Sequence, residues 1–275
     1  MIDKPKKVNR DGIDYIDGKV VIHQSTISAM LNCGEQVRLG NIIKSRTDLV
    51  GFKSEALHYG TRFHRSVESH FRAILDGYDI SIDDIINGLR RTWLVYEDKV
   101  PIQWKADPNS LLLGCEKLIR KYFEWYGEQT PIVPIAVEKN ILLETEYAWL
   151  EGTLDLTTST GIIDWKTAST YTNGKEAADS GLQWMFYPLL ESGCDIKAAT
   201  DISFNYHIAV KSNYQIFSLL KYPKVPDLEV LLYRTIPNVA KMIVNKIYIP
   251  NFSFKWCRSD MCAVWDACRG GMLKL

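Results

Sequence analysis

Two acids and a lysine near the middle of the chain are the residues whose types and spacing could do chemistry together. Asp164 and Lys166 stand two residues apart, and Asp155 comes shortly before them. Residues two apart on a β-strand leave the same face, so Asp164 and Lys166 are predicted to project together, with Trp165 on the other side. Carboxylates hold a hard divalent cation through oxygen, and a lysine steadies an attacking water or a developing charge. Metal-assisted phosphodiester hydrolysis requires these groups.

The surrounding segment is predicted to form three short antiparallel strands that position these residues. We expect them at roughly 138–144, 147–156 and 161–167. The joints are a polar break at 145–146 and a small, hydroxyl-rich stretch at 157–161, both typical of turns. Asp155 then ends the strand next to the one that carries Asp164, so the two carboxylates can meet.

The rest of the chain is predominantly helical in pattern. A short hairpin is expected over 13–22 around Asp17-Gly18, followed by a helix that Ser25 could cap. Apolar periodicity predicts further helices at 55–75, 81–97, 109–126, 176–192 and 226–246, with possible kinks at Pro188 and Pro237. A second hairpin is expected over 201–210 and 214–222. This order predicts an α/β core with a helical elaboration ahead of the sheet.

Composition describes a globular protein and is neutral on nucleic acid. Lys+Arg and Asp+Glu both total 33 in 275 residues, which argues against a DNA binder that is basic all over. There is no apolar run of about 18 residues, so no membrane span is expected. The basic N-terminus lacks the apolar region of a secretory signal, and we expect a cytoplasmic protein. Six cysteines in such a chain favour metal ligation or free thiols over disulfides.

Several motifs, in a fixed order, resemble those of a known family. The runs 152–155 (GTLD) and 163–167 (IDWKT) resemble the core of the PD-(D/E)xK nuclease superfamily, most closely its RecB-type branch, which includes AddB and CRISPR-associated exonucleases. His64 and Glu68 follow Gly60 in a G-x-x-x-H-x-x-x-E pattern like that branch's first motif, and Gln183 and Tyr187 match its Q-x-x-x-Y motif. Read alone, each of these helical residues has an ordinary structural explanation. Their order along the chain carries the resemblance.

The resemblance implies a fold and a set of site residues. The fold would be a restriction-endonuclease-like mixed β-sheet flanked by helices. His64, Asp155, Asp164 and the backbone carbonyl of Trp165 would bind Mg²⁺ or Mn²⁺, and Lys166 would position or activate the water. The remaining members would be Glu68 and Glu138 as supporting acids, and Gln183 and Tyr187 as DNA contacts.

Four cysteines complete the resemblance. Cys33 early in the chain and Cys257, Cys262 and Cys268 near its end match the arrangement by which AddB-like and CRISPR-associated relatives hold a [4Fe–4S] cluster. Four thiolates would satisfy tetrahedral zinc equally well, and residue types alone do not separate the two. The other two cysteines, at 115 and 194, are expected to be buried free thiols.

The resemblance also implies a domain plan. We expect residues 1–24 to form an N-terminal arm with a short hairpin and 25–275 to form a single nuclease domain. Within it, 81–128 would be a helical insertion, and position 33 together with 257–268 would form a cysteine clasp between the two ends of the chain.

The expected function is metal-dependent DNA hydrolysis, with exonuclease action on single-stranded DNA or DNA ends favoured. One alternative is a catalytically silent DNA-binding or scaffolding module of the same fold, against which Lys166 argues because a pure binder has no use for it. Another is a site-specific endonuclease, which fits the Q-x-x-x-Y helix and the cysteines less well. The partners implied are DNA and recombination or CRISPR-type proteins, with no membrane.

Overall fold

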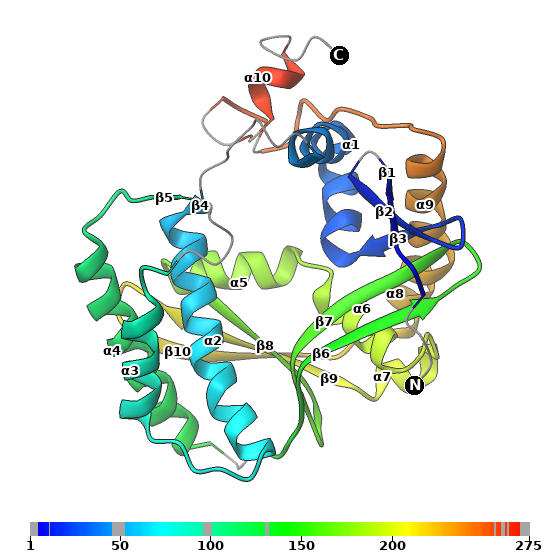
Figure 1. The fold of residues 1–275 in the computed structure, drawn as a ribbon. Helices are drawn as coiled ribbons and strands as arrows, with labels where there is room; N and C mark the ends of the chain where they lie inside the picture. The colour runs from blue at the N-terminus through cyan, green and yellow to red at the C-terminus, as the bar shows by residue number, and fades with distance from the viewer. Residues whose placement is uncertain are drawn as a thin grey trace.

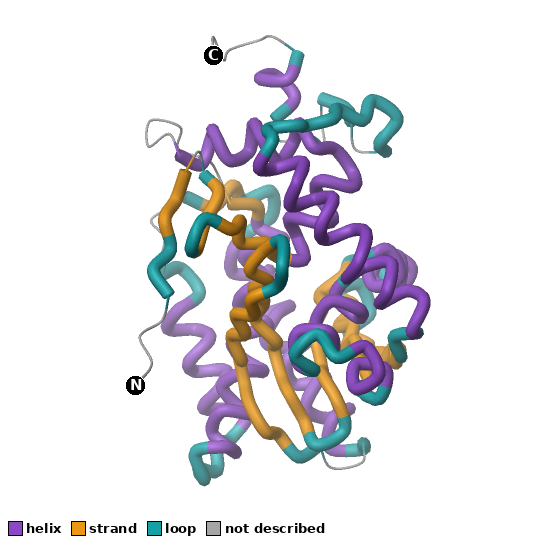
Figure 2. Tube along the Cα trace, turned by 90° about the vertical axis from the view of Figure 1, so that its right-hand side faces the viewer, coloured by secondary structure: helices purple, strands orange, loops and turns teal. Residues whose placement is uncertain are grey.

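The computed structural model of the protein describes residues 5–10, 12–45, 53–95, 101–129, 132–255, 257–259, 262 and 264–269. Within them, the central feature is an eight-stranded mixed sheet with helices on both faces (Figures 1 and 2).

Three consecutive strands form the middle of the sheet, as the sequence predicts. They are β6 (Pro134–Glu144), β7 (Ala148–Thr158) and β8 (Gly161–Ala168), and each is antiparallel to the next. β9 (Ser203–Val210) then runs parallel to β8, and β10 (Gln215–Lys221) forms the predicted hairpin with β9.

The N-terminal strands join the same sheet. They are β1 (Val8–Arg10), β2 (Ile13–Ile16) and β3 (Lys19–His23), and β3 pairs parallel to β7. The turn between β2 and β3 has positive φ at Asp17 (49°) and Gly18 (80°), as a tight two-residue hairpin requires. This confirms the predicted hairpin.

The sheet forks at β7. β6 runs along one edge of β7 over nearly its whole length, so β3 and β8 share the other edge. β3 pairs with residues 148–151 and β8 with 156–158. Within the described residues, 152–155 of β7 therefore have no strand partner on that edge, and Asp155 stands in the opening.

One face of the sheet is covered by three helices: α2 (Glu55–Leu75), α3 (Ile82–Thr92) and α4 (Pro108–Gly127). Ser54 caps α2 by accepting a hydrogen bond from the Leu57 amide, and Phe63, Val67 and Phe71 form its buried stripe. This stripe packs with Ile163 and Trp165 of β8 into one core. The predicted helix over 81–97 is shorter than expected, since α3 ends at Thr92.

The other face carries most of the remaining helices. They are α1 (Gln24–Ser45), α5 (Tyr171–Ser180), α6 (Gln183–Glu191), α7 (Ile196–Thr200), α8 (Val225–Val230) and α9 (Ile236–Val244). Ile162 packs on this side while its neighbour Ile163 packs under α2, which is the alternation a strand imposes. Two short strands, β4 (Lys53–Ser54) and β5 (Ile102–Gln103), pair apart from the main sheet, and α10 (Trp265–Cys268) lies near the end of the chain.

Two predicted helices are divided. The single helix expected over 176–192 is instead α5 and α6, because Gly181 is extended (φ −75°, ψ 151°). α5 also begins earlier than predicted, since the Thr170 side chain caps it by accepting from the Asn173 amide. The helix expected over 226–246 contains a π-helical turn, η1 (Leu231–Thr235), before α9. That wider turn immediately precedes Pro237, whose nitrogen has no hydrogen to donate into a regular helix.

No helix in the described ranges combines the length and apolar character needed to cross a membrane.

Candidate active site

The opening between β7 and β8 brings the predicted acids, lysine and histidine together. Asp155 turns its Oδ2 toward β8, where it accepts a hydrogen bond of 3.0 Å from the Trp165 backbone N–H. The same oxygen lies 3.4 Å from Nδ1 of His64 on α2. Helix α2 and the β7–β8 hairpin, which are far apart in the sequence, therefore meet at one carboxylate.

A close approach of α2 to β8 carries His64 to this place. A Cβ on Gly60 would lie 3.2 Å from Oγ1 of Thr167, so a larger residue would push the helix away from the end of β8. Burial lowers the pKa of His64 to about 4, although the nearby Asp164 charge and a hydrogen bond to the Trp165 backbone act in the opposite direction. At neutral pH the ring is therefore uncharged and has a nitrogen lone pair for a metal.

Asp164 and Lys166 project together, as their spacing predicts. The Lys166 Nζ lies 2.5 Å from Oδ2 of Asp164, whose side chain is only 2% exposed. Burial alone would lower the pKa of Lys166, but the charges of Asp164 and Asp155 outweigh it and raise that pKa. The lysine is therefore a cation at neutral pH.

Burial and a neighbouring carboxylate destabilise the charged form of Asp155. Burial, followed by the charge of Asp164, raises the pKa of Asp155 well above its ordinary value, and the cation of Lys166 offsets this only in part. A buried acid and a half-buried acid beside a neutral imidazole and a backbone carbonyl fit a divalent cation, because its charge would relieve that repulsion. Within the described residues, no three His, Cys, Asp or Glu side chains already stand in a metal-binding arrangement. Here the Lys166 ammonium takes one oxygen of Asp164.

Glu68 and Glu138 lie beside the site. Glu68 accepts a hydrogen bond of 2.5 Å from Arg72, one turn further along α2. Glu138 lies on β6 opposite Asp155 of β7. Its φ is positive, at 50°, which is a backbone conformation unusual for glutamate. Burial, together with the charge of Glu68, raises the pKa of Glu138.

The predicted DNA contacts lie on α6, on the opposite face of the sheet from α2. The Gln183 side chain donates a 3.1 Å hydrogen bond to Oδ1 of Asp164, a contact that the sequence did not suggest. Tyr187 hydrogen-bonds to Gln183, and burial raises the pKa of its hydroxyl. Its ring packs against the backbone of β7 at Gly152, where a Cβ would lie 3.0 Å from the ring. The motif glycine thus makes room for the motif tyrosine.

The four predicted cysteines line one small pocket between α1 and the C-terminal segment. Cys33 interrupts α1 with an extended backbone (φ −166°, ψ 104°), and its Sγ accepts a hydrogen bond of 3.4 Å from the Asn251 amide. Next to it, the Gly34 amide donates to the Ile249 carbonyl at 2.9 Å. The two ends of the chain are therefore joined at this pocket.

The thiols of this pocket fit a thiolate-bound metal group. All six cysteines are free. Burial, followed by the charge of Glu35, raises the pKa of Cys268, and Cys33 and Cys262 contribute to the same direction. Guanidinium and amide donors point at Cys257 and Cys33, and such hydrogen bonds are typical around cluster sulfurs. As at the acidic site, the described residues include no preformed set of three ligands. Cys115 is buried and Cys194 is half-buried, and neither lines this pocket.

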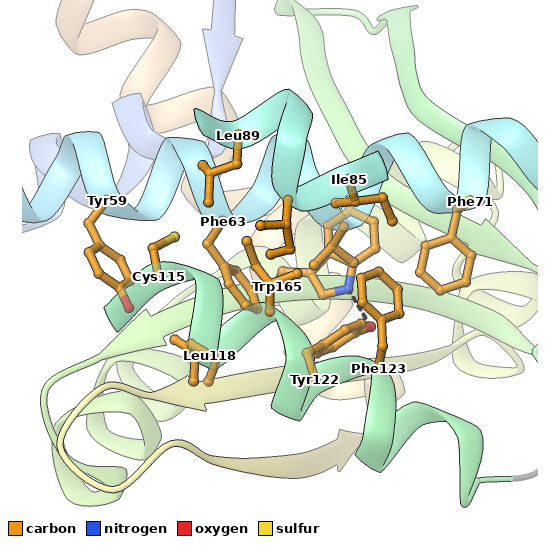
Figure 3. Close-up of a cluster of buried hydrophobic side chains, with 14 of the residues drawn as sticks. Tyr59, Phe63, Phe71, Ile85, Leu89, Cys115, Leu118, Tyr122, Phe123 and Trp165 are labelled. Carbon is orange, nitrogen blue, oxygen red and sulfur yellow. Dashed lines mark hydrogen bonds between the residues drawn. The ribbon is translucent and has the colours of Figure 1, made fainter. Parts of the chain in front are cut away.

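Sequence reasoning missed the groups that hold Trp165. Its indole Nε1 donates to the hydroxyl of Tyr122 at 2.9 Å (Figure 3), and that hydroxyl lies 3.0 Å from Nδ1 of His207. These residues come from α4 and β9 and belong to no motif. Only the parallel register of β8 and β9, which pairs Trp165 with His207, could have pointed to them.

Comparisons with known proteins agree with this geometry. The crystal structure of a candidate exonuclease from Eubacterium rectale is similar, with a TM-score of 0.51 and 12% sequence identity over 93% of this chain and 89% of that chain. At so low an identity the likeness concerns the fold, which is of the restriction-endonuclease-like type. No curated protein matches. A family model for the PD-(D/E)XK nuclease superfamily matches residues 23–269, and the chain therefore belongs to that superfamily.

Proposed function

We propose that the protein is a Mg²⁺- or Mn²⁺-dependent DNA nuclease of the RecB type, acting as an exonuclease on single-stranded DNA or DNA ends. The observation that carries this proposal is the meeting of His64, Asp155, Asp164 and Lys166 in the opening between β7 and β8. Two neighbouring acids, one buried and one half-buried, are costly unless a cation compensates them. Here the acids lie beside the other groups that phosphodiester hydrolysis needs.

The metal would be held by Asp155, Asp164, His64 and the carbonyl of Trp165. A bound divalent cation supplies charge stabilisation for the phosphate oxygens and a lower pKa for water. The protein's part is orientation. The Trp165 amide fixes Asp155 through its 3.0 Å hydrogen bond, and Gln183 fixes Asp164 through one of 3.1 Å.

Lys166 acts as a cation in this proposal. Its raised pKa makes it a poor base at neutral pH, because the proton is held by the neighbouring acids. Its ammonium can instead orient the attacking water through that water's oxygen and offset negative charge on the phosphate. This favours the positioning role over direct activation of the water.

Tyr187 and Gln183 would meet the substrate strand. They share one face of α6, and an amide and a phenol suit contact with phosphate or base. Because Gln183 also donates a hydrogen bond to Asp164, it would connect the DNA strand to the acid that holds the metal.

The cysteine pocket would hold a [4Fe–4S] cluster, with zinc as the alternative. Four thiolates satisfy either group. Its role would be structural, since it ties α1 to the C-terminal segment and takes no part in hydrolysis. Metal binding there would add to the folding free energy.

Two other functions remain as alternatives. A silent DNA-binding module of this fold would have no need for an ammonium paired with Asp164 beside a second acid. A site-specific endonuclease would use the same metal site, so only the pattern of products separates it from an exonuclease.

The decisive experiment is cleavage of labelled DNA by the purified protein. Linear single-stranded and duplex DNA labelled at either end, and circular single-stranded DNA, are incubated with Mg²⁺, Mn²⁺ or EDTA. We expect release of mononucleotides or short products from linear DNA with either metal, none with EDTA, and intact circles. Cut circles would identify an endonuclease. No cleavage of any substrate, combined with retained DNA binding, would identify the silent module and refute the proposal.

A further inference from the structure

A chain of buried polar groups joins the helical layer to the strand that carries the site. The indole of Trp165 donates to Tyr122 (Figure 3). The Tyr122 hydroxyl also lies 3.0 Å from Nδ1 of His207. Trp165 and Tyr122 are fully buried and His207 is 2% exposed. Polar groups at such depth are costly to leave unpaired, so this chain constrains the atoms it joins.

The constraint matters because both backbone groups of Trp165 face the site. Its N–H donates to Asp155 at 3.0 Å, and its carbonyl oxygen accepts a hydrogen bond from the ring of His64. A small rotation of the strand about its axis would move both groups together. It would also move Asp164 and Lys166, which flank Trp165 on the opposite face.

Stacking alone does not fix the position of the Trp165 indole within its own plane. The indole stacks on Phe71 of α2, with centroids 5.7 Å apart and planes inclined by 22°. Stacking fixes the plane of the ring, but sliding within that plane costs little because dispersion contacts have no fixed direction. The 2.9 Å hydrogen bond to Tyr122 is directional and fixes the indole within the plane.

His207 supports Tyr122 from the neighbouring strand. The β8–β9 register sets His207 beside Trp165, and the Tyr122 hydroxyl bridges the two side chains from α4. That oxygen accepts the indole proton and shares a second hydrogen bond with Nδ1 of His207, in a direction set by the tautomer of the ring. Burial lowers the pKa of His207 to about 3, so the ring stays neutral. The Asn205 amide, 3.3 Å from Nε2, steadies the ring on its other side.

We propose that Tyr122 is a positioning residue for the metal site, acting through Trp165 and supported by His207. The inference gives the helix α4 a task in the reaction although no atom of α4 is placed near the substrate. The inference rests on the proposed function only for the binding of a metal at the site. The effect of Tyr122 on the position of Trp165 does not depend on any bound metal.

The first test follows Trp165 in the protein without added metal. Protein labelled with ¹⁵N-tryptophan is studied in EDTA by NMR hydrogen exchange, as wild type, Tyr122→Phe and the control Tyr126→Phe. Tyr126 lies one turn away on α4 with its ring parallel to that of Tyr122, but its hydroxyl is outside the chain of hydrogen bonds. We expect at least about tenfold faster exchange of the Trp165 amide and indole protons in Tyr122→Phe, and no change in the control. Unchanged exchange of the Trp165 amide in Tyr122→Phe would overturn the proposal.

The second test separates positioning from general stability by a double-mutant cycle. Mn²⁺ affinity is measured by calorimetry for Tyr122→Phe in the wild-type and Trp165→Phe backgrounds. Phenylalanine keeps a ring at position 165 but has no N–H for Tyr122 to accept. We expect the Mn²⁺ Kd to rise about tenfold or more in the wild-type background and not to rise further in Trp165→Phe.

The outcomes separate the two hypotheses. Equal losses of Mn²⁺ affinity in both backgrounds would mean that Tyr122 acts only on stability, which overturns the positioning role. Wild-type protein that binds no Mn²⁺ would overturn the proposed function. Even then, faster amide exchange at Trp165 in Tyr122→Phe would support the positioning role.

Discussion

Replacing Asp155 by asparagine is expected to stabilise the protein in EDTA while removing its activity. Asp155 is 15% exposed at its side chain, and burial and Asp164 together hold its pKa above the ordinary value. Asparagine keeps an oxygen at the position of Oδ2, which accepts from the Trp165 amide. The substitution therefore removes a destabilising charge and retains this hydrogen bond.

The size of the effect follows from the linkage between pKa and stability. A rise of a single pKa unit corresponds to about 1.4 kcal/mol. The loss of attraction between Asp155 and Lys166 offsets part of any larger gain, although Lys166 keeps Asp164 at 2.5 Å. We therefore expect Asp155→Asn to unfold about 3–6 °C higher than wild type in EDTA at pH 7.

The sign of the pH dependence is fixed by the raised pKa of Asp155. An acid whose pKa is higher in the folded state holds its proton more tightly there than when unfolded. Its stabilising contribution is present below the unfolded pKa of about 3.9 and is lost as the pH rises through the folded pKa. The advantage of Asp155→Asn over wild type should therefore be absent near pH 3.5 and grow from about pH 4 upward.

The assay is thermal unfolding followed by circular dichroism, in EDTA and in Mg²⁺. Mg²⁺ should raise the melting temperature of wild type in proportion to its binding and leave that of Asp155→Asn nearly unchanged. Asp155→Ala serves as a control, because it leaves the Trp165 amide without an acceptor and should not stabilise. A variant Asp155→Asn no more stable than wild type in EDTA, or equally stabilised by Mg²⁺, would refute this account of the acid pair.

Three further outcomes are expected. Lys166→Met should abolish cleavage, by more than about a hundredfold, with an unchanged circular dichroism spectrum; cleavage at the wild-type rate would exclude the lysine from the mechanism. Tyr187→Phe should weaken single-stranded DNA binding in fluorescence anisotropy while the calorimetric Mn²⁺ affinity stays constant, and the reverse pattern would remove Tyr187 from the substrate interface. Protein purified without oxygen should be brown, with absorbance near ~400 nm. Cys33→Ser should lose that colour and melt at a lower temperature, whereas Cys115→Ser and Cys194→Ser should keep the colour; a colourless preparation with stoichiometric zinc would identify a zinc clasp.

The sequence predicts the elements near the site because their signals are local. Alternation of side chains and short polar joints indicate the strands of Asp155 and Asp164, and an apolar stripe indicates α2 with His64. Gly181 shows the limit of such signals, since a glycine within a helical pattern can be tolerated or can end the helix. Here it ends α5, and nothing nearby in the sequence decides between the two.

The fork of the sheet could not be predicted, because it depends on pairing between distant segments. β3 and β7 are parallel partners separated by most of the N-terminal half of the chain. His207 becomes a neighbour of Trp165 only through the β8–β9 register. Glu138 likewise looks like an ordinary strand residue in the sequence, whereas its φ in the structure is positive.

The fork also explains why one carboxylate serves both the fold and the chemistry. Pairing between β7 and β8 stops at Leu156 and Ile163, so the backbone of β8 beyond that point lacks β7 as a partner. A buried amide without an acceptor would be costly, and the Trp165 N–H finds one in the Asp155 side chain at 3.0 Å. The Asp155 carboxylate thereby takes the place of a backbone acceptor on β7, and the same hydrogen bond holds the carboxylate in place. Its other contacts then lie in the opening, where a neighbouring acid, a lysine and an imidazole converge. Opening the sheet creates the space for the proposed site and also supplies the amide that orients Asp155.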